Sequence, residues 1–157
     1  MTRRFLILLC LAAVIPATAL AQSYTAVLSG AAEVPGPGDT DGAGLAVLTI
    51  DGSTIRYTIL TQNIGAPTLA HIHAGAAGVA GSPVVTLDVN TLTSGSAQNV
   101  SADVIAAIVA NPAGHYVNVH TAGFPQGAVR GQLVTPSSQG SRVQYIPVVG
   151  KAAGAAG

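Results

Sequence analysis

Residues 45–61 read LAVLTIDGSTIRYTILT, and this stretch decides the fold class. Asp51-Gly52 lies between two apolar segments, which is a strong signal for a β-hairpin with a two-residue turn. In the second segment the apolar and polar side chains alternate, as expected when one face of an antiparallel strand is buried and the other faces water. The sequence therefore predicts paired strands over Leu45–Ile50 and Thr54–Thr61.

Outward from this hairpin, the chain continues as short strand-like segments separated by loops rich in glycine and proline. One helix interrupts them, with Ser101 as its N-cap, Asp103 in its first turn, and Asn111-Pro112 at its end. About seven to eight short antiparallel strands with one short helix predict an all-β fold, a β-sandwich or a small Greek-key barrel. The further predicted strands are Ser23–Ser29, Leu69–His73, Val84–Val89, His115–Thr121 and Ala128–Val134.

The two ends of the chain differ in composition from the middle. Residues 1–21 combine a basic start, an apolar run and Ala19-Leu20-Ala21, the pattern of a cleaved signal peptide. The run is too short to span a bilayer, so we expect a secreted or periplasmic protein with no membrane segment after cleavage. Residues 22–136 are expected to form one domain, and 137–157 a flexible Gly/Ala-rich tail or the truncated start of a further segment.

Charge and cysteine content exclude several classes of function. After cleavage four basic residues stand against six acidic ones, and the basic residues do not cluster as nucleic-acid binding requires. The one cysteine, Cys10, lies in the leader, so neither a disulfide framework nor a thiol nucleophile is expected. The acidic residues show no paired spacing for hydrolysis.

Four histidines lie between residues 71 and 120, two of them in the segment AHIHAG (70–75). Because side chains alternate along a strand, His71 and His73 share one face, with Cα atoms roughly 7 Å apart. The same alternation in HYVNVHT (115–121) places Tyr116, Asn118 and His120 on one face. His71, His73 and His120 are therefore candidate ligands of one metal ion.

His115 is a weaker fourth candidate. Its odd separation from His120 points it to the opposite face of a regular strand. A β-bulge at the preceding Gly114 would be needed to bring it back. Water is the alternative fourth ligand.

The segments SYTAVLSGAAEVP (23–35), AHIHAG, GHYVNVHT (114–121) and FPQGAVRGQL (124–133) resemble the chordin-type (CHRD) domain, found in animal chordins and in secreted microbial proteins. The resemblance covers about Ser23–Val134 and implies an immunoglobulin-like β-barrel. It implies no agreed biochemical activity.

A more distant resemblance is to the copper/zinc superoxide dismutases. The pair His71 and His73, the later His120, and Arg130 before the last strand match the order of the dismutase copper ligands and active-site arginine. The loop AGAAGVAGSP (74–83) contains no histidine, acid or cysteine, so the zinc half of such a site is missing. The resemblance implies a copper-only site, with Arg130 as a catalytic residue that holds the superoxide anion. Copper also has the redox chemistry that zinc lacks.

Two functions remain open at this point. One is a secreted copper-binding protein that dismutates superoxide. The other is a non-enzymatic extracellular module that binds a protein or matrix partner through a sheet face or the 31–44 loop, with a purely structural spacer in reserve. For Arg130 a salt bridge or a solvated position stands as the alternative to a catalytic role.

Overall fold

The Asp51-Gly52 hairpin is present in the computed structural model, which describes residues 21–136. Strand β2 (Ala43–Asp51) pairs in antiparallel register with β3 (Thr54–Gln62). Gly52 has a φ of +58°, a left-handed conformation that glycine adopts without the steric penalty of a Cβ atom. The central prediction from residues 45–61 is therefore confirmed.

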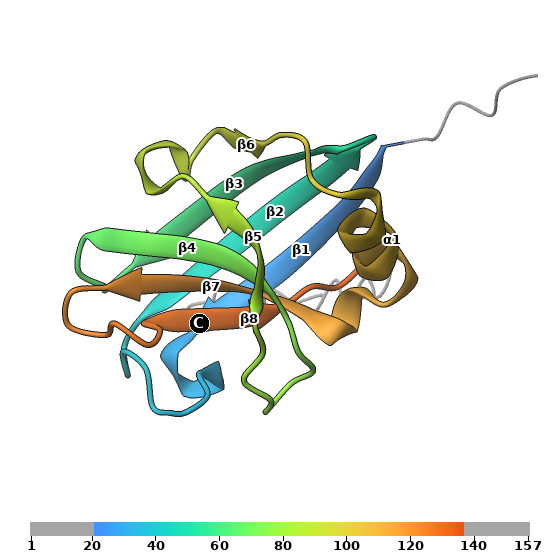
Figure 1. Ribbon diagram of the computed structural model, residues 1–157. Coiled ribbons are helices and arrows are strands. Elements are labelled where there is room, and N and C mark those ends of the chain that lie inside the picture. The colour runs from blue at the N-terminus through green and yellow to red at the C-terminus, as the bar shows by residue number, and fades with distance from the viewer. Residues whose placement is uncertain (1–20, 137–157) are drawn as a thin grey trace, which may run out of the picture.

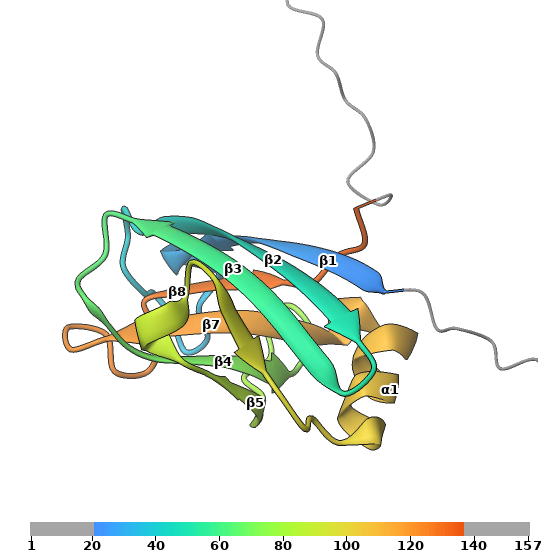
Figure 2. The ribbon, with the colours of Figure 1, turned by 90° about the horizontal axis from the view of Figure 1, so that it is seen from above.

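Within residues 21–136, eight strands form one antiparallel sheet in the order β5-β4-β7-β8-β1-β2-β3-β6. The sheet curls so that β1, β2 and β3 face β4, β5, β7 and β8, as Figures 1 and 2 show, while its terminal strands β5 and β6 are not paired with each other. The predicted all-β fold, a barrel-like sheet with one helix, is confirmed. The remaining strands are β1 (Gln22–Ser29), β4 (Pro67–Ala74), β5 (Pro83–Leu87), β6 (Gly95–Ala97), β7 (His115–Thr121) and β8 (Val129–Gln132).

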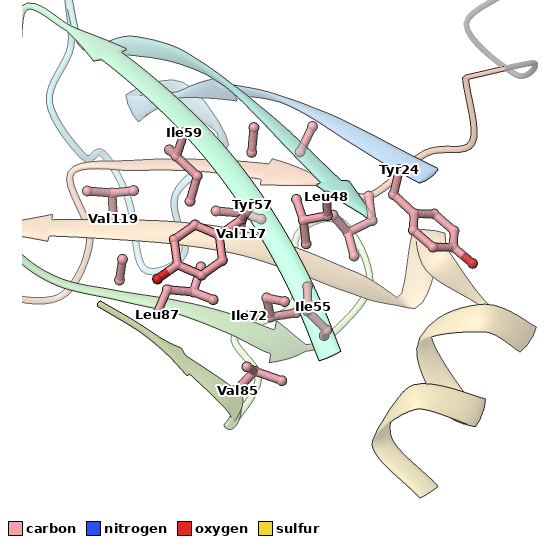
Figure 3. Packing of buried hydrophobic residues seen from close by; sticks show 14 of the residues in the cluster. Tyr24, Leu48, Ile55, Tyr57, Ile59, Ile72, Val85, Leu87, Val117 and Val119 are labelled. Carbon is pink, nitrogen blue, oxygen red and sulfur yellow. The ribbon is translucent and has the colours of Figure 1, made fainter. Parts of the chain in front are cut away.

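The core lies between the two halves of the sheet (Figure 3). Every second side chain of each long strand points into it, which is the alternation that the hairpin sequence displays. Burial of these apolar side chains supplies the main driving force for folding. The members of this core include Leu28, Leu48, Ile55, Ile59, Ile72, Val117, Val119 and Leu133, all with at most 2% of their surface exposed.

Helix α1 (Ala102–Ala110) covers one end of the barrel (Figure 1). The predicted N-cap is confirmed, because the Ser101 hydroxyl accepts a hydrogen bond from the Val104 amide at 3.4 Å. Ile108 of the helix is fully buried. Short 3-10 helices occupy Gly30–Ala32, Val89–Thr91 and Pro112–Gly114.

The structure differs from the prediction mainly at strand ends. Strand β5 stops at Leu87 because the Asp88 carboxylate accepts a hydrogen bond from the Asn90 amide, which starts a 3-10 turn. Strand β6 was not predicted, since Gly-Ser-Ala carries no strand signal. The predicted leader and the predicted tail after Pro136 lie outside the described residues. Within residues 21–136, no helix has the length and apolar character to cross a membrane.

Candidate metal centre

The three histidines of the sequence prediction lie on the outer face of the sheet, over β4 and β7. Ala70 and Ile72 of β4 are fully buried on the inner face, so His71 and His73 point outward. In β7, Val117 and Val119 point inward, and His120 is on the outer face with Asn118 and Tyr116. The alternation predicted from AHIHAG and HYVNVHT is therefore the one observed.

Strand pairing brings the two histidine-bearing segments side by side. In the β4–β7 register, His71 is opposite Asn118 and His73 is opposite Tyr116, while His120 is opposite Leu69. Asn118 is in turn opposite Arg130 of β8. Residues 49 positions apart in sequence are thus neighbours on one sheet surface.

The three imidazole rings converge. The ring centroid of His71 is 5.4 Å from that of His73 and 5.3 Å from that of His120, and the His73–His120 distance is 6.4 Å. One nitrogen from each ring lies within 4.8 Å of the others, which makes these residues a possible metal-ion group. The rings are not splayed to opposite sides of the fold.

Hydrogen bonds to the backbone identify the nitrogens that face the centre of this group. His73 Nδ1 lies 2.8 Å from the Gly81 carbonyl oxygen, and His120 Nδ1 lies 3.0 Å from the Pro125 carbonyl oxygen. Carbonyls only accept, so each Nδ1 carries the proton and each Nε2 has a free lone pair. His71 contributes Nδ1, which lies 3.4 Å from His120 Nε2.

This arrangement has the features of a metal centre. A ligating histidine usually donates its second ring N–H to a carbonyl or carboxylate, as His73 and His120 do here. His73 Nε2 is buried and has no hydrogen-bond partner within the described structure. At metal–nitrogen distances of about 2.1 Å, two ligands of one ion lie at most about 4.2 Å apart. The observed separations, all within 4.8 Å, are close to this limit.

Burial favours the neutral form of the two histidines of β4. Burial lowers the pKa of His71, and the neighbouring His120 and His73 lower it further. Burial is also the main cause that lowers the pKa of His73, partly opposed by its hydrogen bond to Gly81. Neutral imidazole is the form that binds a metal ion.

His115, the fourth candidate, is not part of this group. It pairs with Ala74, and the β4–β7 register is continuous from Leu69 to Ala74, so the bulge that would have turned His115 outward is absent; the one register shift between these strands lies at the other end, between Pro67 and Leu69. Its Nδ1 donates to the Asn111 carbonyl oxygen at 2.9 Å. The expectation that His115 joins the other three is corrected by the regular extended backbone at this position.

Arg130 lies on the same outer face but does not contact the histidines directly. Its guanidinium carbon is 3.4 Å from the centre of the Tyr116 ring, and His73 stacks on that ring at 4.8 Å between centroids. Two groups this close cannot share one ring face, so the Tyr116 ring separates them. Arg130 is 1% exposed, with Nη2 donating to Ala76 and Gln132 and Nη1 unpartnered within the described residues.

A buried acid that the sequence analysis missed completes this surface. The Asn118 side-chain amide donates to both carboxylate oxygens of Glu33 at 2.8 Å, and Glu33 is 5% exposed. Burial raises the pKa of Glu33 to about 7, although the nearby Arg130 charge and the Asn118 hydrogen bond act in the opposite direction. A Cβ atom on Gly38 or Gly127 would collide with this side chain, so the two glycines make room for it.

Comparison with models of protein families identifies the family of this chain. The model of the CHRD domain matches residues 24–133, which is most of the chain. The chain belongs to the CHRD domain family. The CHRD match includes the strands that carry all three clustered histidines. No curated protein and no solved structure gives a significant match, and the resemblance to the dismutases stays a prediction.

Proposed function

We propose that this CHRD domain is an extracellular copper-binding protein, with His71, His73 and His120 as the protein ligands. The convergence of three imidazole nitrogens, two of them fixed by backbone carbonyls, is the observation that carries the proposal. CHRD domains are extracellular modules, where a bound copper ion would be accessible to small solutes.

Copper is favoured over other metals by the chemistry of the donors. All three ligands are imidazoles, which suit copper, zinc, nickel and iron, and among divalent first-row ions Cu²⁺ binds nitrogen sites most tightly. A hard ion such as Mg²⁺ or Ca²⁺ prefers oxygen donors, and no carboxylate belongs to this group. Three protein ligands also leave a coordination position for water or a substrate.

Superoxide dismutation is the reaction that we propose for such a site. Bound copper would supply the redox step, in which one superoxide is oxidised to dioxygen and a second, with two protons, is reduced to hydrogen peroxide. The chain's own residues would then hold the ligand rings in place and supply a fixed positive charge. Arg130 would provide that charge from behind the Tyr116 ring; its guanidinium is buried, so it would attract an anion to the site without contacting it.

Metal analysis of copper-loaded protein tests the binding proposal. We expect about one copper per wild-type chain, and a loss of bound copper in His71→Ala, His73→Ala and His120→Ala. His115→Ala is the matched control, since His115 is outside the group, and its copper content should equal that of wild type. At free copper 100 times the Kd, binding should raise the unfolding free energy by about 2.7 kcal/mol. Unchanged copper content in all three variants would remove the proposed site.

A superoxide assay on the same proteins tests the catalytic part separately. We expect copper-dependent loss of superoxide in wild type and in His115→Ala, and none in the three ligand variants. Arg130→Gln should keep its copper and lose rate, because the positive charge is removed while the three copper ligands are unchanged; circular dichroism checks that the fold survives loss of the Arg130 contacts with Tyr116, Ala76 and Gln132. Copper binding without superoxide turnover would leave a copper-binding module and exclude the dismutase.

The second candidate, a non-enzymatic binding module, is favoured by an exposed apolar sheet face on β1–β3, on the other half of the barrel from the histidines. A partner captured equally well by wild type and by a variant lacking His71, His73 and His120 would support this alternative.

A further inference from the structure

The ring of His73, one of the three clustered histidines, forms one end of a stack with Tyr116 and Arg130. The His73 and Tyr116 rings are nearly parallel, with an interplanar angle of 13° and a centroid separation of 4.8 Å. The guanidinium carbon of Arg130 lies 3.4 Å from the centre of the Tyr116 ring, on its other face. A cation in this position over an aromatic ring is held favourably by the ring quadrupole. One aromatic ring therefore separates a positive charge from a candidate copper ligand.

Hydrogen bonds hold this stack in place. The Tyr116 hydroxyl accepts from the Gly81 amide at 3.1 Å, and the Gly81 carbonyl oxygen is the acceptor for His73 Nδ1 at 2.8 Å. The same short segment thus fixes both rings relative to each other. The stack is therefore a defined part of the site rather than a chance contact.

The positive charge of Arg130 is buried and is not cancelled by a bonded acid. Arg130 is 1% exposed, and the two acceptors of its Nη2, the Ala76 carbonyl oxygen and Gln132 Oε1, are both neutral. Its Nη1 has no partner in the part of the chain that the structure describes. The nearby acid, Glu33, is bonded by the Asn118 amide instead. Water and salt screen a buried charge poorly, so the charge of Arg130 acts on its neighbours more strongly than a surface charge does.

One of the groups that this charge reaches is the His73 imidazole. Burial is the main cause of the lowered pKa of His73, and the charges of His120 and Arg130 lower it further, because they oppose a second positive charge on the ring. A metal ion on the same imidazole meets the same repulsion. The repulsion is greater for Cu²⁺ than for Cu⁺, because the Coulomb energy is proportional to the charge.

We propose that Arg130, acting through the Tyr116 ring and His73, raises the reduction potential of copper bound at this site. The proposal rests on the proposed copper site, and it makes Arg130 a positioning residue for the oxidation state of the metal. This role is separate from the attraction of superoxide, because it needs no substrate. At an effective dielectric constant of about 20, a unit charge about 10 Å away changes a binding constant by about one order of magnitude.

Chelator competition, measured separately with Cu²⁺ and with Cu⁺ under anaerobic conditions, tests this proposal. Arg130→Gln should tighten Cu²⁺ binding relative to Cu⁺ binding about tenfold, which corresponds to a potential lower by about 59 mV. Arg130→Lys keeps a positive charge and should stay close to the wild-type ratio. Arg56→Gln is the matched control, because Arg56 is exposed on β3, in the opposite half of the barrel from β4 and β7 (Figure 2). At pH 6, Glu33, with a pKa of about 7, is mostly protonated and does not offset the Arg130 charge.

Gln132→Glu is a second variant, in which the three side chains of the stack are unchanged. It sets a carboxylate against Arg130 Nη2 and should shift the ratio in the same direction as Arg130→Gln, so it decides the test if Arg130→Gln does not fold by circular dichroism. The variant also loses the hydrogen bonds that Gln132 Nε2 donates to Gly75, Ala113 and His115, an effect common to both ions that cancels in the ratio.

The outcomes separate this proposal from the proposed function. Copper binding by wild type with the same Cu²⁺ to Cu⁺ affinity ratio in every folded variant would overturn this proposal alone. Equal weakening of both ions in Arg130→Gln would also overturn it, because a purely structural role has that effect. A wild type that binds neither ion would overturn both.

Discussion

Replacing Glu33 by glutamine should remove a loss of stability that this domain suffers as the pH rises from 4.5 to about 7. Glu33 is buried, and its pKa is raised from the ordinary value of 4.5 to about 7, chiefly by burial. A carboxyl group with a raised pKa binds its proton more tightly in the folded state than in the unfolded state. Wild type therefore loses stability as the pH rises from 4.5, where the unfolded chain releases the proton, to about 7, where the folded protein does.

The magnitude follows from the size of the shift. At about 1.36 kcal/mol per pH unit, the displacement from 4.5 to about 7 corresponds to a loss of up to about 3 kcal/mol. Glutamine is neutral at every pH and resembles the protonated acid, so the Glu33→Gln variant avoids this loss. Relative to wild type, the variant should gain stability between pH 4.5 and 7 and keep a constant advantage above pH 7.

Urea unfolding of both proteins at intervals from pH 4 to 8, without added metal, measures this difference. The histidines also titrate in this range, but their contribution is common to both proteins and cancels in the comparison. Asp51→Asn is the control, since Asp51 is exposed. Altered hydrogen bonding to Asn118 adds a constant to the difference in unfolding free energy between Glu33→Gln and wild type, so the test is how that difference changes with pH. If the difference is the same at every pH from 4 to 8, the Glu33 carboxyl does not have the raised pKa, and the prediction is wrong.

Three further substitutions test individual contacts. Gly127→Ala should destabilise the protein by more than about 2 kcal/mol in urea unfolding, because Gly127 has a φ of +140° and an added Cβ would meet the Glu33 carboxylate. Gly123→Ala is the control: a Cβ there has nothing within 4 Å, so the unfolding free energy should be nearly unchanged. Ser101→Ala should cost about 1 kcal/mol in thermal unfolding through loss of the helix cap, whereas Ser101→Asp should not. Tyr116→Phe removes the hydroxyl that accepts a hydrogen bond from the Gly81 amide, and the Gly81 carbonyl in turn accepts from His73 Nδ1. The variant should therefore bind copper more weakly, as measured by competition with a chelator. Equal copper affinities of the variant and wild type would exclude this positioning role.

The sequence was sufficient for the features that depend on local alternation. The hairpin at Asp51-Gly52, the cap at Ser101 and the common outward face of His71, His73 and His120 all follow from spacing within a single strand or turn. Which strands are neighbours does not follow from such spacing. The β4–β7 pairing, which brings His71 next to His120, joins segments far apart in the chain, and alternation alone predicted only that they could meet.

Features that depend on tertiary packing were missed or wrong. His115 was a weaker fourth candidate that needed a bulge to reach the metal group, and the β4–β7 register has no extra residue there. Glu33 lies in a loop of small residues and prolines, a context that indicates exposure. It is buried because Gly38 and the distant Gly127 leave space for it, and because the Asn118 amide donates to both of its carboxylate oxygens.

The central claim is that one ion is held by three imidazoles from two strands, and electron paramagnetic resonance of the copper-titrated protein tests it most directly. We predict a single Cu²⁺ species at one equivalent, with hyperfine splitting from imidazole nitrogens. That signal should be retained in His115→Ala and replaced by the spectrum of unbound or weakly bound copper in His73→Ala. A spectrum identical in wild type and in a variant lacking His71, His73 and His120 would contradict the account.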